Sequence, residues 1–123
     1  MQNLFFALGS GLSLLGVVLG AFGAHTLKSK ISSEMLETFE VAVRYQMYHS
    51  LGLIAVAWAV SQWPNQLTAA SGWCFVAGIL IFSGSLYILS LTGIRWLGAI
   101  TPIGGLAFII GWGCLMIAAI RGG

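Results

Sequence analysis

Residues 3–24 read NLFFALGSGLSLLGVVLGAFGA and contain no charged side chain. At a rise of ~1.5 Å per residue, a helix of this length measures about 33 Å and can cross the ~30 Å hydrocarbon core of a bilayer. The three residues at its start lack the positive charge of a signal peptide, and the apolar run is longer than a usual signal-peptide core. We therefore expect this helix to be a retained membrane span.

Charged residues are rare in the whole chain. Of its 123 residues, 59% are hydrophobic and 7% are charged, whereas soluble domains carry about 25% charged residues. So few charged side chains cannot cover a water-exposed surface, so we expect lipid to surround most of the chain. The net charge is only +2 and no Lys/Arg cluster occurs, which argues against a nucleic-acid partner.

Three further runs complete the predicted architecture, over residues 44–62, 67–91 and 102–120. The turn at Trp63-Pro64 and the polar segments 25–33 and 92–96 separate the runs. Thr101 and Pro102 resemble an N-cap followed by proline in the first turn. The sequence thus predicts an all-α fold: an integral membrane four-helix bundle with short connections, forming one four-span domain over residues 1–123.

An amphipathic segment precedes the second span. Ser33 is a candidate N-cap, and Glu34 lies in the first turn, where the helix dipole favours a carboxylate. Glu37, Glu40 and Arg44 share one face of residues 34–44, at the spacing of a solvated helix surface. We expect this segment to extend the second helix at or above the membrane surface, with Glu40 and Arg44 as an ordinary i, i+4 pair.

The charges of the connections predict an orientation. With four spans, both termini lie on one side and the first and third connections on the other. Those connections carry Lys28, Lys30, Arg44 and Arg95, against Arg121 and the N-terminal amine on the opposite side. The positive-inside rule then predicts cytoplasmic connections and both termini outside the cytoplasm, in the inner (plasma) membrane.

Small residues are the expected packing surfaces, because lipid provides no hydrophobic drive for helix association. Gly16, Gly20 and Ala24 form a small-xxx-small ridge on the first helix, and Gly9 and Ser13 extend the small positions along it. Gly104 and Gly105 lie early in the fourth helix. We expect a bulky residue at Gly20 to push a neighbouring helix away.

Polar groups gather near the start of the second span. His25 ends the first helix, and Arg44, Tyr45, Gln46 and His49 open the second, with Gln46 and His49 expected to point inward. One interpretation is a functional site in which the two histidines bind a metal or haem or relay a proton. The other is that both histidines lie near the headgroups and hydrogen-bond to backbone carbonyls.

Signatures of other chemistry are missing from the sequence. Aspartate is absent, and Cys74 and Cys114 lack metal-ligand spacing, so we expect two free thiols. Ser83, Ser85, Ser90 and Thr92 could line a pore, although such hydroxyls usually bond to carbonyls of their own helix. We predict no catalytic, cofactor-binding or metal-binding residues and no cofactor.

Four motifs resemble a known family. They are GAFGAH (20–25), ETFEVAVRYQMYHSL (37–51), GSLY (84–87) and ITPIGG (100–105). Together they resemble the bacterial membrane family called domain of unknown function 423. The resemblance implies four spans and one domain, and it implies that His25, Gln46, His49 and the Thr101-Pro102 entry matter for structure or function. It implies no activity, substrate or cofactor.

The leading functional hypothesis is a non-enzymatic accessory or structural subunit that interacts with lipids or other membrane proteins, as a homo-oligomer or within a larger complex. Its small size and glycine ridge motivate this. A small oligomeric transporter or channel is the alternative, and a membrane protein with a His-ligated metal or haem is a third.

Overall fold

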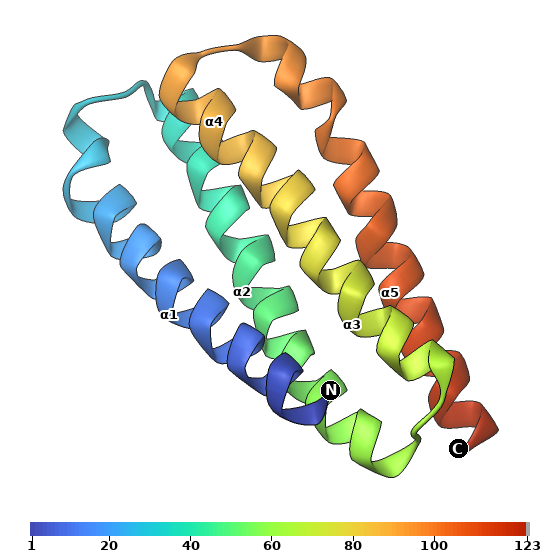
Figure 1. Ribbon diagram of the computed structural model, residues 1–123. Coiled ribbons are helices and arrows are strands. Elements are labelled where there is room, and N and C mark those ends of the chain that lie inside the picture. Colours follow the sequence, from blue (N-terminus) through green and yellow to red (C-terminus); the bar gives the residue numbers. More distant parts are fainter. Residues whose placement is uncertain (123) are drawn as a thin grey trace.

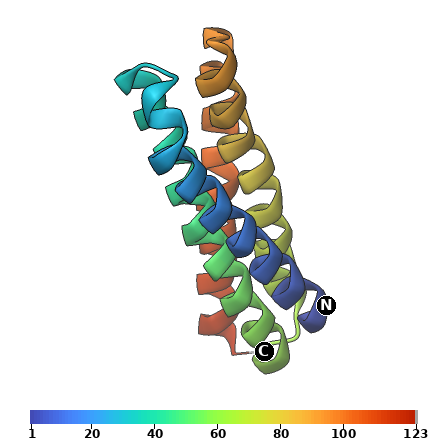
Figure 2. The same cartoon turned by 90° about the vertical axis from the view of Figure 1, so that its left-hand side faces the viewer.

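The computed structural model describes residues 1–122, which form four helical rods packed side by side (Figures 1 and 2). They are α1 (Gln2–His25), α2 (Ser33–Gln62), a third rod made of α3 (Gln66–Gly78), η2 (Ile79–Ser83) and α4 (Gly84–Thr92), and α5 (Thr101–Arg121). Short 3-10 turns, η1 (Leu27–Ser29) and η3 (Arg95–Ala99), lie in two connections. The rods alternate in direction, so both termini lie at one end of the molecule (Figure 1). The all-helical fold class is confirmed.

Three helical segments are long and apolar enough to cross a membrane, namely Gln2–Ser29, Gln66–Thr92 and Arg95–Arg121. They correspond to the predicted spans over 3–24, 67–91 and 102–120. The predicted span over 44–62 is not among them, because Gln46, His49 and Ser50 make that part of α2 less apolar. These three side chains are buried against other helices.

Helix α2 is continuous, so the amphipathic segment stands as an extension of the second rod (Figure 1). Its N-cap is Ser32, whose hydroxyl accepts a hydrogen bond from the Met35 amide at 3.2 Å. The predicted N-cap, Ser33, is the first helical residue. Helix α5 shows the same offset, because Thr101 already belongs to the helix and Ile100 precedes it. Pro102 lies in the first turn, where its missing N–H costs no hydrogen bond.

The third rod contains a π-helical turn that the sequence did not predict. At η2 the Gly84 amide donates to the Ile79 carbonyl, five residues earlier. Such a turn adds one residue to the helical cycle and is common at functional sites. Here it brings the buried Ser83 hydroxyl to the Ala42 carbonyl of α2, at 2.7 Å. Phe82, in the same turn, lies against α5.

Helices α1 and α2 pack through glycines spaced seven residues apart. Gly9, Gly16 and Gly23 are buried, whereas Gly20 is half-buried and Ala24 is exposed. The contact therefore follows a seven-residue interval, which includes Gly16 of the predicted ridge and Gly9 of its extension but not Gly20 or Ala24. A seven-residue interval keeps one stripe of a helix against a neighbour that crosses it at a shallow, left-handed angle.

Gly9→Ala is expected to destabilise the protein, and Gly20→Ala is not. A Cβ at Gly9 would lie 2.7 Å from the Ser50 carbonyl oxygen, a backbone atom that cannot move aside, whereas a Cβ at Gly20 would lie 3.4 Å from Val43. Overpacking of this kind costs about 1–3 kcal/mol. Unfolding titrations in mixed detergent–SDS micelles, followed by circular dichroism, measure both. Equal losses at the two positions would contradict this packing.

Helix α5 is held almost entirely by the third rod. It packs on α3 and η2, where Gly78 receives the ring of Phe108 and Gly104 lies against the backbone of Phe82. Its contact with α2 is slight and passes through side chains. The core is formed by Phe5, Leu53, Val56, Ala57, Phe75, Ile79 and Phe108. Because α5 contacts α2 only slightly, a groove remains between them.

Candidate functional site

Gln46 joins three rods through two hydrogen bonds. Its amide nitrogen donates to the Leu12 carbonyl of α1 at 2.8 Å, and the Tyr87 hydroxyl of α4 donates to its amide oxygen at 2.6 Å. Gln46 is 2% exposed, so both ends of the amide are paired away from lipid. A buried amide with both ends paired fixes the positions of α1, α2 and α4, because any shift would leave a polar group unpaired.

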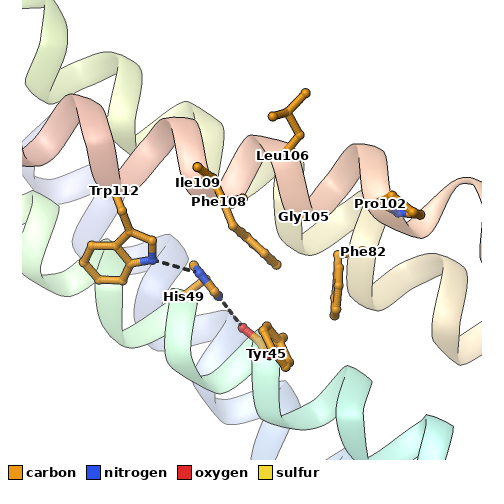
Figure 3. A pocket seen from close by; sticks show the side chains of 9 residues that line it. All are labelled: Tyr45, His49, Phe82, Pro102, Gly105, Leu106, Phe108, Ile109 and Trp112. Atoms are coloured by element: carbon orange, nitrogen blue, oxygen red, sulfur yellow. Dashed lines mark hydrogen bonds between the residues drawn. The ribbon is translucent and has the colours of Figure 1, made fainter.

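His49 faces the opposite way, toward α5 (Figure 3). The Trp112 indole N–H donates to its Nε2 atom at 3.0 Å, and its Nδ1 atom lies 2.8 Å from the Tyr45 carbonyl. An indole can only donate, so Nε2 accepts and Nδ1 donates, which is the neutral tautomer. The imidazole also stacks on Phe108, with ring centroids 3.5 Å apart. These contacts leave His49 without a free nitrogen for a metal ion.

A groove of about 570 Å³ lies beside His49, between α2 and α5 (Figure 3). We call it the α2–α5 groove. It is lined by Tyr45, His49, Phe82, Pro102, Gly105, Leu106, Phe108, Ile109 and Trp112. The lining is almost entirely apolar and aromatic, and the volume falls within the ~300–1,000 Å³ of small-ligand pockets. Such a surface suits a hydrocarbon, and both nitrogens of the His49 imidazole in its wall are already hydrogen-bonded.

The five residues of the predicted polar cluster do not form one site. Gln46 and His49 are buried, as expected, but they serve different faces of α2. His25 and Arg44 are exposed, and Tyr45 lies half-open at the groove. His25 lies far from His49 because of the way α1 is shifted lengthwise along α2.

Ser13 and Ser50 are hydrogen-bonded at 2.9 Å, which places His49 level with Ser13. Twelve residues separate Ser13 from His25, a distance of about 18 Å along α1. The two histidines therefore share no metal or haem site. Within residues 1–122, no group of three His, Cys, Asp or Glu side chains is placed to hold a metal ion.

The other polar expectations have mixed outcomes. Between residues 1 and 122 the one ion pair joins Arg95 to Glu34 at 3.2 Å, and both side chains are exposed. The expected Glu40–Arg44 pair does not form. The two cysteines are free, as predicted. Ser85, Ser90 and Thr92 donate to carbonyls three or four residues earlier in their own rod, as predicted, whereas Ser83 crosses to α2.

Comparison with known proteins identifies the family. A family model described as "Protein of unknown function (DUF423)" matches residues 19–105. The chain belongs to this family. Among its relatives, the UPF0382 membrane protein YwdK of Bacillus subtilis is 50% identical over 122 residues, covering 98% of both chains.

Two further UPF0382 membrane proteins extend the comparison. Those of Staphylococcus haemolyticus and Staphylococcus saprophyticus are 49% and 48% identical over 120 residues. Each alignment covers 98% of this chain and 98% or 99% of the relative. No solved structure matches the chain. The names of the relatives and the three apolar helices agree that this DUF423 protein is a membrane protein.

Two contributors to the site in this DUF423 protein were missed by the sequence reasoning. Tyr87 and Trp112 lie inside long apolar runs, several residues from either end, where the Tyr/Trp belt of an interface is not expected. A phenol or indole at that depth needs a hydrogen-bond partner. Gln46 and His49 were the available partners, so this signal was present in the sequence.

Trp112→Phe in this DUF423 protein is expected to cost little stability. It removes the donor to His49 and keeps an aromatic ring, and single hydrogen bonds inside membrane proteins average about 0.6 kcal/mol. Unfolding in detergent–SDS micelles measures the loss, and Trp96→Phe, at an exposed position, is the matched control. In a His49→Phe background the Trp112→Phe cost should vanish, and a persistent cost would mean that the hydrogen bond is not its origin.

Proposed function

We propose that this DUF423 protein is a four-span integral membrane protein that works by binding, as a non-enzymatic accessory or structural subunit of a homo-oligomer or larger membrane complex. The α2–α5 groove carries this proposal, since it opens beside α5 and presents an apolar, aromatic surface. Its partners would be lipids or the membrane segments of other proteins.

The crossing of α2 is part of the proposal. This helix lies among apolar rods, and its polar residues Gln46, His49 and Ser50 are buried and hydrogen-bonded. Polar side chains that are paired in this way lose most of the cost of entering a bilayer. In the proposed topology α2 therefore crosses the bilayer as well as the three apolar helices. Residues 1–123 then form one domain with four spans.

The proposed orientation follows from the charges. Lys28, Lys30 and Arg95 belong to the first and third connections, and Arg44 lies in the half of α2 next to them. Arg121 ends α5, on the side of both termini. The positive-inside rule supports cytoplasmic connections and external termini in the plasma membrane. Membrane-impermeant thiol labelling of single cysteines placed in residues 28–30 and near the C-terminus, in a Cys74→Ala/Cys114→Ala background, tests this directly. Labelling of residues 28–30 in intact cells would reverse the orientation.

A binding role also agrees with how the polar side chains are used. The side chains of Gln46, His49 and Ser83 reach other helices or the backbone, and they hold the rods in place. None of them faces the others across a common cavity. Their hydrogen bonds therefore serve to position the helices, and the lipid-facing surfaces remain available to bind partners.

Purification from native membranes in a mild detergent, followed by mass spectrometry of the intact assembly, tests the proposal. We expect the protein to emerge as an oligomer or with stoichiometric partner subunits or lipids. An unrelated four-span protein of similar size, purified with the same tag, is the control for adventitious capture. A strictly monomeric particle without bound protein or lipid would contradict the proposal.

A further inference from the structure

We infer that Cys74 of α3 and Cys114 of α5 are a redox pair, which a lipid-soluble hydroperoxide converts into a disulfide that holds α5 to the third rod. Both cysteines are free thiols in the structure, so the pair is present in its reduced form. It is separate from the α2–α5 groove and from the hydrogen bonds of Gln46 and His49. This redox chemistry is additional to the proposed binding role.

Helices α3 and α5 approach each other closely because glycines line their contact. A Cβ at Gly78 of α3 would lie 3.2 Å from the carbonyl oxygen of Gly104, and a Cβ at Gly111 of α5 would lie 3.1 Å from the Cβ atom of Cys74. The two Cβ atoms of a disulfide are about 3.5–4.5 Å apart. The α5 backbone therefore passes Cys74 within the range that a disulfide can span.

The register of the two helices brings Cys114 to the same place. The helices run in opposite directions (Figure 1), and Gly111 is level with Cys74. Cys114, three residues further along α5, lies about 4.5 Å closer to the end of the molecule that holds both termini. Because a helical Cα–Cβ bond tilts toward the start of its own helix, Cys74 tilts toward the level of Cys114 and Cys114 tilts back. The two side chains converge, and a charge on one thiol is felt by the other.

Both thiols lie on the edge of the α3–α5 contact that is turned away from α2. The side of α2 is marked by Phe75 and Trp112, whose ring centroids lie 5.3 and 5.8 Å from that of His49. Cys74 is one residue from Phe75, about 100° around α3, and Cys114 is two residues from Trp112, about 200° around α5. Each cysteine is half-buried, so the pair is partly open to lipid.

The depth of the two thiols determines the kind of oxidant. Cys74 lies about 12 Å along α3 from Gln66, and Cys114 lies about 10 Å along α5 from Arg121. In the proposed four-span topology both sulfurs are therefore below the membrane surface. A hydroperoxide that dissolves in the bilayer reaches them there.

The reaction balances in two steps. The sulfur of one thiol attacks the hydroperoxide, the O–O bond breaks, and a sulfenic acid and an alcohol form. The second thiol then attacks the sulfenic sulfur, which forms the S–S bond and releases water. The two thiols lose two electrons to the peroxide bond, and their two protons leave in the alcohol and the water.

Intact-mass spectrometry of the reduced protein in liposomes, treated with cumene hydroperoxide, tests the redox pair. Thiols that remain are then alkylated with N-ethylmaleimide in SDS. We expect the chain to lose about 2 Da for two hydrogen atoms and to take up no maleimide, with dithiothreitol restoring both labelling sites. Peptide mapping should join Cys74 to Cys114. Two thiols that stay alkylatable, a sulfinic acid without a disulfide, or a disulfide only between two chains would each overturn the inference.

A control variant moves one thiol around α5 at almost the same depth. In Cys114→Ala/Gly113→Cys the new thiol is turned by about 100°, to a position where a Cβ meets no atom within 4 Å. Because disulfide geometry is specific, we expect the disulfide to form at least about tenfold more slowly than in the wild type. Equal rates would show that the α3–α5 register does not direct the reaction, which would overturn the pairing.

Unfolding in SDS tests whether the disulfide holds α5. Because a cross-link restricts the unfolded chain, the oxidised wild type should unfold at least about tenfold more slowly than the reduced wild type. The control variant should unfold at one rate before and after the hydroperoxide treatment. A wild type that carries the disulfide and unfolds no more slowly would overturn the clamping of α5.

Discussion

Gly104→Ala is expected to detach α5 from the third rod and to cause the largest loss of stability of any single methyl addition to this protein. A Cβ at this position would overlap the backbone nitrogen and Cα of Phe82 in η2. Neither backbone can yield without moving a whole helix, so the cost should reach the upper part of the ~1–3 kcal/mol range of overpacking, or exceed it. Unfolding in detergent–SDS micelles, followed by circular dichroism, measures it.

Two neighbouring glycines of α5 provide the controls for Gly104→Ala. A Cβ at Gly105 would make an ordinary contact at 3.8 Å, and a Cβ at Gly113 would touch nothing within 4 Å. Alanine at either position should be neutral or slightly stabilising, since alanine is favoured over glycine in helices by up to about 1 kcal/mol. If all three alanine variants unfold alike, α5 does not approach η2 as closely as described here.

His49→Ala is expected to be comparably damaging, by about 2–4 kcal/mol, a typical cost of large-to-small changes in a core. It removes the ring stacked on Phe108 and leaves the Trp112 indole N–H without its acceptor. The same unfolding titration measures the loss. Because His49 provides the polar link between α2 and α5, whose backbones make little direct contact, the variant should also expose α5 to proteolysis.

His25→Ala is the matched control for His49→Ala, because His25 is exposed at the end of α1. It should change stability by no more than a surface substitution, about 0.5 kcal/mol. His49→Phe separates stacking from hydrogen bonding, since it keeps a ring against Phe108 and gives Trp112 no acceptor. Comparable losses in the two histidine variants would revive a shared site for His25 and His49.

The helices themselves could be predicted from the sequence because their causes are local. Runs without charge, the Trp63-Pro64 turn, the Ser32–Glu34 segment and Thr101-Pro102 each mark an element boundary, and the structure places the boundaries within one or two residues. The inward orientation of Gln46 and His49 also follows from a helical wheel. These features depend on the helical repeat and on capping chemistry, which a single chain segment specifies by itself.

The arrangement of the site could not be predicted because it depends on offsets between helices. Whether His49 lies beside His25 or about 18 Å away is decided by how α1 slides along α2. That offset is set by the close approach at Gly9, Gly16 and Gly23, and a four-residue ridge at Gly16, Gly20 and Ala24 was equally plausible in the sequence. The groove is less predictable still, because it depends on how closely α5 approaches α2.

The π turn at η2 puts the two halves of the third rod out of phase with each other. The one additional residue rotates everything after it by roughly 100° relative to an uninterrupted α-helix, the angle that one residue subtends in such a helix. As a result, α3 can direct Phe75 toward His49 while α4 directs Tyr87 toward Gln46 on the other flank of α2. The one additional residue thus allows a single straight rod to present side chains to two different faces of α2.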